Sequence, residues 1–256
     1  MGNDLVHVVV DGGVATVTLA SPGNRNALSR HLVADLGAAL DVAEARAGDG
    51  SVRAIVLGHV PPAFCAGADL KERRMGPPDS APFVRVLQRL MDAAVPTIAA
   101  VSGPARAGGI GLMAACDLVV VQRDVTFALT EVRIGVAAAV ISVPILRRVT
   151  PAKIAVPMLT GEPFDTEFAR EIGLVTHVSD DVHGTVDVLC EAVMVGAPRA
   201  IAATKRLLRV VPTLDRNTAF AEMRALSDEL FRGADAAEGM AAFREKRPPV
   251  WPTLST

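Results

Sequence analysis

The chain has 256 residues, of which 50% are apolar and 21% are charged. This is the length of one large domain or two small ones, and the apolar content suffices for a packed core, which excludes an intrinsically disordered chain. The 26 basic and 28 acidic side chains leave a net charge of −2, and only 4% of the residues are aromatic. We therefore expect no binding to nucleic acid or to an anionic membrane surface.

Cysteine usage and the apolar segments indicate the compartment. The cysteines, Cys65, Cys116 and Cys190, form neither a disulfide framework nor a C-x-x-C metal pair, which favours a reducing environment. The N-terminal residues lack a basic region followed by an apolar one and do not predict a signal peptide. The most apolar region, Val95–Val121, is interrupted by prolines, glycines and charges, so it should not span a membrane. We expect a soluble cytoplasmic protein.

The first sixty residues predict a hairpin, a helix and a strand. Two β-rich runs, Val6–Val10 and Val14–Leu19, flank an Asp-Gly-Gly turn sequence. Ser29 then offers an N-cap to an amphipathic helix that extends to Arg46. The apolar run Arg53–Gly58 is typical of a short buried strand.

Strands and helices continue to alternate up to about residue 135, which predicts an α/β fold with parallel strand pairing. In this part we expect a helix over Phe83–Ala94, a strand over Thr97–Val101, a helix that ends at Ala115 and a strand over Leu118–Gln122. Beyond Ile141 the pattern is helical, with few strand signals. The predicted helices there cover residues 141–149, 151–159, 166–172, 182–195, 198–210, 214–231 and 234–246.

Two turns rich in small residues follow predicted strands, one at Phe64–Asp69 and one at Ser102–Gly109. Small residues let a ligand approach the backbone, and the second turn leads into a helix N-terminus, where N–H groups point outward. Two such turns facing each other would hold one oxygen between two amides, as an oxyanion hole does for a thioester carbonyl that becomes an enolate. The alternative is that the small residues serve tight packing alone.

Three runs of the sequence resemble the crotonase, or enoyl-CoA hydratase/isomerase, superfamily, and they occur in the order and at the spacing of that family. They are A-F-C-A-G-A-D-L-K-E-R (Ala63–Arg73), V-S-G-P-A-R-A-G-G-I-G-L-M-A-A-C-D (Val101–Asp117) and T-F-A-L-T-E-V-R-I-G (Thr126–Gly135). Further matches cover most of the chain, at Pro22–Ser29, Leu159–Phe164, Ile172–Val178 and Glu238–Pro249.

This resemblance implies an α/β fold built as a spiral of ββα units. Residues 1–195 would form the spiral core, and residues 196–256 would form a helical C-terminal region that mediates trimerisation, as a homotrimer or a dimer of trimers. The substrate would be an acyl-CoA thioester, and no cofactor would be needed beyond the coenzyme A of the substrate itself.

The resemblance also implies the catalytic groups. The backbone N–H groups of Ala68 and Gly108 would bind the thioester oxygen, and Glu131 would be the acid/base residue. Family hydratases use a second glutamate on the helix after the second turn, and Gly111 stands at that position here. Alternatives for Glu131 are a solvated loop carboxylate or an ion-pair partner of Arg133.

The missing carboxylate bears on the reaction. Water addition needs one group to deprotonate water and another to protonate C2, whereas a 3-to-2 double-bond shift needs a single base. The sequence therefore favours isomerase chemistry, or hydration in which Thr130, Arg106 or a water on Glu131 takes the missing role. The alternative function is a scaffold that binds CoA thioesters with little or no catalysis.

Further residues match positions near the family's CoA and acyl groups. Arg106 could recognise a second carboxylate on a substrate of the methylglutaconyl type, because a guanidinium pairs bidentately with a carboxylate, or it could be a surface side chain. For the remaining substrate-binding positions, ordinary surface charge or packing is the alternative. These positions are Ala66, Arg25, Lys71, Phe243 and Lys246.

Other site chemistries have little support in the sequence. The five histidines form no spaced ligand pair and there is no H-E-x-x-H motif, so we expect no metal site. The serines lack a G-x-S-x-G elbow, which argues against a hydrolase triad.

Overall fold

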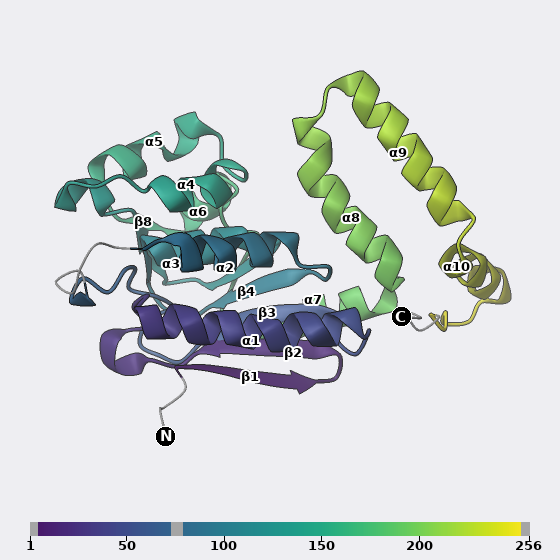
Figure 1. Cartoon of the computed structure of the whole chain (residues 1–256), viewed down its shortest axis with the longest axis horizontal. Coiled ribbons are helices and arrows are strands. Elements are labelled where there is room, and N and C mark those ends of the chain that lie inside the picture. Colours follow the sequence, from purple (N-terminus) through teal and green to yellow (C-terminus); the bar gives the residue numbers. More distant parts are fainter. Residues whose placement is uncertain (1–4, 73–78, 252–256) are drawn as a thin grey trace.

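The computed structural model describes residues 5–72 and 79–251, and its centre is a six-stranded sheet (Figure 1). Arg73, at the end of the first family-like run, lies outside the described residues. The strand order is β1-β2-β3-β4-β6-β9. The first pair is antiparallel and all the others are parallel. The strands are β1 (Val6–Asp11), β2 (Val14–Leu19), β3 (Ala54–His59), β4 (Thr97–Val101), β6 (Leu118–Gln122) and β9 (His177–Ser179).

Helices cover both faces of this sheet, so its central strands are apolar on both sides. In β3, Ile55 and Leu57 join the larger core under three helices, whereas Ala54 and Val56 join the core under α7. The helices of the larger core are α1 (Arg30–Gly48), α2 (Ala81–Asp92) and α3 (Gly108–Ala115), and α7 is Val182–Val195. Because successive side chains of β3 point to opposite faces of the sheet, this one strand contributes to both cores.

A second, three-stranded sheet lies beside the first and carries the site. Its strands are β5 (Ala105–Arg106), β7 (Thr126–Ala128) and β8 (Phe164–Asp165). The chain passes from β4 through β5 into α3, and from β6 through β7 towards α4 (Ala139–Leu146). Each strand–strand–helix unit therefore adds one strand to each sheet, which confirms the expected spiral of ββα units.

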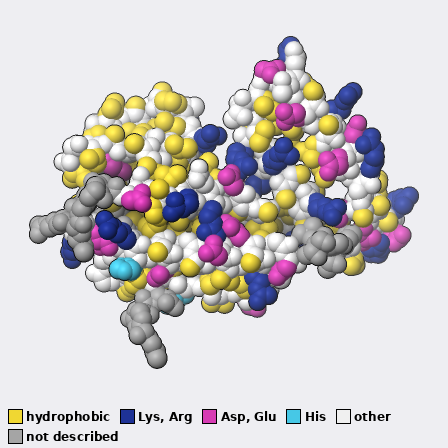
Figure 2. Space-filling view, viewed as in Figure 1, with side chains coloured by type: hydrophobic (Ala, Val, Ile, Leu, Met, Phe, Trp, Pro, Cys, Tyr) yellow, Lys and Arg dark blue, Asp and Glu magenta, His cyan; other side chains and the backbone are white. Residues whose placement is uncertain are grey.

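Short helices complete the layer above α3 (Figure 1). They are α5 (Pro151–Thr160) and α6 (Thr166–Glu171). The described residues also include the 3-10 helices η1 (Pro22–Asn24), η3 (Glu131–Ile134) and η4 (Val211–Thr213). Hydrophobic side chains gather over this part of the surface (Figure 2). The exposed apolar residues there include Val143, Val156 and Leu159.

The last three helices, which we call the arm, stand apart from the sheet and carry many basic side chains (Figures 1 and 2). They are α8 (Pro198–Val210), α9 (Arg216–Phe231) and α10 (Ala234–Glu245). Only Lys205 and Ala242 of these helices are buried. After α10 the chain returns to the end of α7, where the Trp251 indole N–H donates to the Val195 carbonyl over 3.0 Å.

Most predicted elements occur at or near the expected bounds. β4, β6, α7 and α8 have the predicted limits, and the side chain of Ser29 caps α1 by accepting from the Leu32 N–H over 3.1 Å. The helix expected over Phe83–Ala94 begins two residues earlier, because Pro82 is compatible with a first helical turn. The expectation of few strands beyond Ile141 missed β8 and β9.

Candidate active site

Three chain segments run side by side in the same direction and end at one edge. Ala105 forms a parallel bridge with Cys65 on one side and a parallel pair with Phe127 on the other. Because the strands are parallel, the residues that follow each of them emerge at the same edge. The residues that follow include Ala68, Gly108 and Glu131, the three expected catalytic positions.

The first two turns touch at Gly67 and Ala107. A Cβ atom on Gly67 would lie 2.9 Å from the Ala107 Cβ and 3.2 Å from the Arg106 carbonyl oxygen, and Gly67 has φ +87°. Ala107 itself has φ 48° directly before α3. A glycine is therefore required at position 67 for both space and backbone conformation, and it lets the turns approach closely.

The N–H groups of Ala68 and Gly108 have no hydrogen-bond acceptor within the described part of the chain. Leu28 pairs with the groups on either side of Ala68, donating to the Gly67 carbonyl over 2.8 Å and accepting from the Asp69 N–H over 3.4 Å. Gly108 is the first residue of α3, where an N–H has no acceptor within the helix. In residues 5–72 and 79–251, neither amide donates to another protein group. Both amides can thus bind an external oxygen.

Leu28 also closes the space beside the second turn. A Cβ atom on Gly108 would lie 2.5 Å from Leu28 Cδ1 and 3.6 Å from the Phe83 ring. Leu28 therefore contacts both turns, through its backbone at Ala68 and through its side chain at Gly108. The sequence of Pro22–Ser29 does not reveal this contact, because Leu28 meets Gly108 only in the folded chain.

Glu131 begins η3 with a half-buried carboxyl group. Its Oε2 atom is buried and has no hydrogen-bond partner among the described residues. Burial raises the pKa of this carboxyl above its ordinary value. Arg133 instead contacts Glu162 Oε1 over 2.6 Å and the Thr160 carbonyl over 2.9 Å. Glu131 is therefore not the ion-pair partner of Arg133, and its environment suits a proton-transfer group.

Ile141 of α4 occupies the space beside Gly111 of α3. A Cβ atom on Gly111 would lie 2.3 Å from Ile141 Cγ2 and 2.8 Å from Ile141 Cβ, and Ile141 is buried. A glutamate at position 111 would not fit this arrangement. The loss of the second carboxylate is thus accompanied by a close apolar contact between α3 and α4.

Three expected CoA-binding residues gather around the first turn. The Arg25 carbonyl accepts from the Ala66 N–H over 3.0 Å, and the Lys71 N–H donates to Asp69 Oδ1 over 3.0 Å. Arg25 and Lys71 are both exposed. Their charged side chains are therefore available near the turn that carries Ala68.

Arg106 binds the protein backbone rather than standing free on the surface. Its guanidinium donates to the carbonyl oxygens of Ala105 and Thr126 and, over 2.9 Å, to Thr126 Oγ1. Thr126 opens β7, whereas Gly108 and Glu131 follow the ends of their strands. Arg106 thus reaches back along β7, away from the edge that carries the amides.

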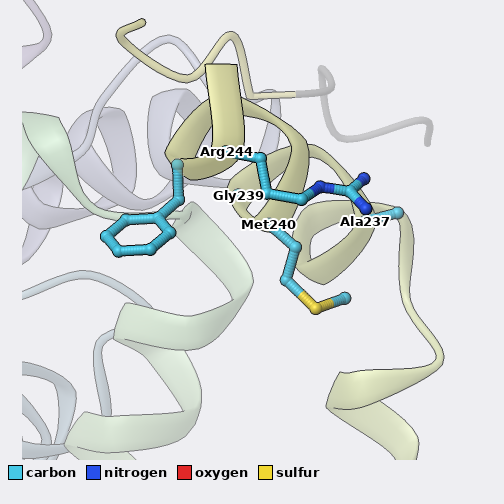
Figure 3. A pocket seen from close by; sticks show the side chains of 5 residues that line it. Ala237, Gly239, Met240 and Arg244 are labelled. Atoms are coloured by element: carbon cyan, nitrogen blue, oxygen red, sulfur yellow. The ribbon is translucent and has the colours of Figure 1, made fainter. Parts of the chain in front are cut away.

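Phe243 and Lys246 lie on and directly after α10, which is far from α3 in Figure 1. Within one chain they therefore do not join the two turns. Phe243 is 86% exposed, beside a groove of about 580 Å³ (Figure 3). The groove is lined by Ala237, Gly239, Met240, Phe243 and Arg244.

Among the described residues, no group of three or more His, Cys, Asp or Glu side chains lies close enough together to hold a metal ion. No helix in the same part of the chain has the length and apolar character needed to cross a membrane.

Comparison with known proteins identifies the family. The model of the family "Enoyl-CoA hydratase/isomerase" matches residues 10–253. The chain belongs to this family. The resemblance stated from the sequence is therefore confirmed.

Individual relatives agree with the family assignment. A Thermus thermophilus protein named "Putative enoyl-CoA hydratase" is 38% identical over 94% of this chain and 98% of its own length. The mitochondrial methylglutaconyl-CoA hydratase of Mus musculus is 30% identical over 93% of this chain and 79% of its own length. The crystal structure of a Mycobacterium smegmatis enoyl-CoA hydratase superposes with a TM-score of 0.90 at 32% identity, covering 97% of this chain and 99% of that one.

Proposed function

We propose that this family member shifts the double bond of a 3-enoyl-CoA to the 2-position, with Glu131 as the single base and the amides of Ala68 and Gly108 as the oxyanion hole. The observation that carries this proposal is the common edge at which the three segments end. It is supported by two amides and one buried carboxyl oxygen that have no hydrogen-bond partner among residues 5–72 and 79–251.

The proposed reaction needs one proton carrier. The Glu131 carboxylate removes a proton from C2 of the substrate, and the electron pair moves to the thioester oxygen and forms a dienolate. The two amides stabilise that charge, and the N-terminus of α3 adds its dipole. Protonated Glu131 then returns the proton to C4, so the double bond moves from C3–C4 to C2–C3 and the carboxylate is regenerated.

The contact between Gly111 and Ile141 favours isomerisation over hydration. Hydration by two carboxylates would require a second acidic side chain on α3, and the apolar contact with Ile141 leaves no room for one at position 111. A hydratase in this chain would have to hold and deprotonate water with Glu131 and a non-carboxylate group.

The test compares two substrates with purified protein. We expect a 3-enoyl-CoA to be converted to the conjugated 2-enoyl-CoA, with slower or no addition of water to crotonyl-CoA. Glu131→Gln should lower kcat by about 10²–10⁴-fold and leave KM within a small factor. Faster turnover of crotonyl-CoA would support hydration instead. Binding of CoA thioesters without either reaction would support the scaffold function, and full activity of Glu131→Gln would refute Glu131 as the base.

We also propose that the arm mediates self-association, as a homotrimer or a dimer of trimers. Large apolar side chains of α9 and α10, including Phe220, Phe231 and Phe243, are each at least 70% exposed. A second copy that covered α10 could bring Phe243 and Lys246 to the CoA of its neighbour. Light scattering coupled to size-exclusion chromatography measures the assembly, and a monomer at micromolar concentration would refute it.

A further inference from the structure

His59 lies at the end of β3 and links it to the residue that follows β4. Its Nε2 atom accepts from the Ser102 N–H over 3.0 Å, and its Nδ1 atom is 3.1 Å from the Val60 carbonyl oxygen. The ring packs edge-on against Phe64, with ring centroids 5.5 Å apart. Both ring nitrogens of His59 therefore have a backbone partner.

These two contacts specify one form of the ring. The Ser102 N–H can only donate, so Nε2 must be unprotonated, and the Val60 oxygen can only accept, so Nδ1 must carry the proton. A doubly protonated His59 would set its Nε2–H against the Ser102 N–H. The arrangement therefore requires a neutral ring with the proton on Nδ1.

The contact with Ser102 opens a series of contacts that leads to the two proposed oxyanion amides. After it, the Pro104 carbonyl accepts from the Phe64 N–H over 3.1 Å, and the Cys65 carbonyl accepts from the Arg106 N–H over 2.9 Å. The next contact is the close approach of Gly67 to Ala107. Ala68 and Gly108, which carry the two proposed oxyanion amides, directly follow these two residues. The two segments therefore run in register over Phe64–Ala68 and Pro104–Gly108. His59 contacts Ser102 just before this register begins, and the first segment has a longer loop than the second between the two points.

Packing at Gly103 makes this register sensitive to His59. A Cβ atom on Gly103 would lie 3.0 Å from Ala63 Cα, 3.0 Å from the Pro62 oxygen and 3.2 Å from His59 Cε1. The backbone of the second segment thus rests directly on the first segment and on the His59 ring. A change in the ring would be transmitted to both segments, since no space separates them.

We propose that neutral His59 is a positioning residue, which holds the two segments in register so that the amides of Ala68 and Gly108 converge on one oxygen. This inference rests on the proposed function of those amides. Burial lowers the pKa of His59, and the charge of His183 near the start of α7 acts in the same direction, whereas backbone contacts with Val60 and Ala63 oppose it. The environment therefore favours the uncharged ring.

A measurement that is independent of activity tests the ring itself. In ¹⁵N spectra of histidine-labelled full-length protein, the signal assigned to His59 by its loss in His59→Gln should report a neutral ring with the proton on Nδ1 at about pH 7.5. On acidification this ring should become charged at a lower pH than an unperturbed histidine, whose pKa is about 6.5. A ring that becomes charged at or above that pH, or a neutral ring with the proton on Nε2, would overturn the proposal.

Kinetics test the positioning role. His59→Leu removes the acceptor for Ser102 and should lower kcat by about tenfold or more while KM changes less than about twofold, because a misplaced donor weakens charge stabilisation in the transition state. His59→Gln keeps an acceptor for the Ser102 N–H and should recover most of kcat. His7→Leu, at an exposed position of β1, is the matched control and should match the wild type.

The outcomes separate this inference from the proposed function. If the wild type turns over an enoyl-CoA and folded His59→Leu has the same kcat, the positioning role is wrong. A His59→Gln variant that folds but is as slow as His59→Leu would also contradict it. If no enoyl-CoA is turned over by the wild type, the proposed function fails, and the positioning role fails with it even though the ring form is still measured by the spectra.

Discussion

Lys205 of α8 forms an ion pair with Asp117, which follows α3, over 2.8 Å between Nζ and Oδ2. The side chain of Lys205 is only 8% exposed, and Nζ also donates to the Val95 carbonyl over 3.0 Å. Asp117 Oδ2 in turn accepts from the N–H of Thr97 over 2.7 Å. One buried cation therefore joins the arm to the ends of two core elements.

Removing this cation should destabilise the protein strongly. Lys205→Met would leave Asp117 without its charge partner and should lower the free energy of unfolding by about 3 kcal/mol, as expected when one member of a buried pair is lost. Urea unfolding measures the change. The control is Arg232→Met, which breaks an exposed pair with Asp228 and should cost less than about 1 kcal/mol. Equal effects of the two substitutions would contradict the role of burial.

The raised pKa of Glu131 predicts the acid limb of the pH–rate profile. A general base must be ionised, so kcat/KM should fall as the pH decreases through the pKa of the free enzyme. Because burial raises the pKa of Glu131 above its ordinary value of 4.5, the limb should lie above pH 4.5. Initial rates between pH 4.5 and 8 measure it. A limb at or below the ordinary value would contradict the desolvated environment.

The raised pKa of Glu131 also predicts that ionisation of this carboxyl, which activates the base, destabilises the folded protein. The folded state holds the Glu131 proton more tightly than the unfolded chain does, so its ionisation disfavours folding as the pH rises through the interval between the two pKa values. Glu131→Gln removes this penalty. Its free energy of unfolding should exceed that of the wild type at pH 7, and the gain should shrink towards the acid end of the interval. Urea unfolding at several pH values tests this, and a destabilised variant at pH 7 would contradict it.

Gly67 and Gly12 form a matched pair for the close approach of the two turns. Both have a positive φ, at +87° and +53°, but a Cβ atom on Gly12 would meet no atom within 4 Å. Alanine at either position should cost roughly 1–2 kcal/mol of backbone strain. Only Gly67→Ala should also lower kcat, because it forces Ala107 away. Comparable kcat values for the two variants would show that the turn spacing is not critical.

The contact between Gly111 and Ile141 predicts strong coupling in a double-mutant cycle. Gly111→Ala should destabilise the protein by about 1–3 kcal/mol through overpacking, although alanine is the better helix former. In an Ile141→Ala background the same change should cost clearly less, because the Cγ2 atom at 2.3 Å is absent, although the Cβ atom at 2.8 Å is still present. Thermal and urea unfolding of the four proteins measure the coupling. Additive effects would contradict the close contact.

Local sequence patterns were sufficient to predict most strands of the six-stranded sheet. The run Thr97–Val101 is apolar throughout and forms a strand with five buried residues, and Ser29 caps its helix through the expected hydroxyl contact. The second sheet lacked such a signal. β5 and β8 contain two residues each, and strands this short are stabilised by their neighbours rather than by intrinsic preference.

The candidate site likewise contains features that the sequence predicts and contacts that it does not. The two turns were visible as clusters of small residues, and the resemblance located Glu131. The partner of Gly111 was not predictable, because Ile141 is thirty residues away and reaches it only when α4 packs on α3. The contact between His59 and Ser102 likewise joins residues 43 positions apart, and the isolated histidine has no motif around it.

The hydrogen bond from Trp251 to Val195 ties the chain after α10 back to the end of α7, the helix from which the arm starts. The helices of the arm are consequently held at both extremities although little of their surface is covered. Cleavage within the segment that joins α9 to α10 would leave two separately attached pieces, whereas loss of the indole would free one end and let α10 swing outward.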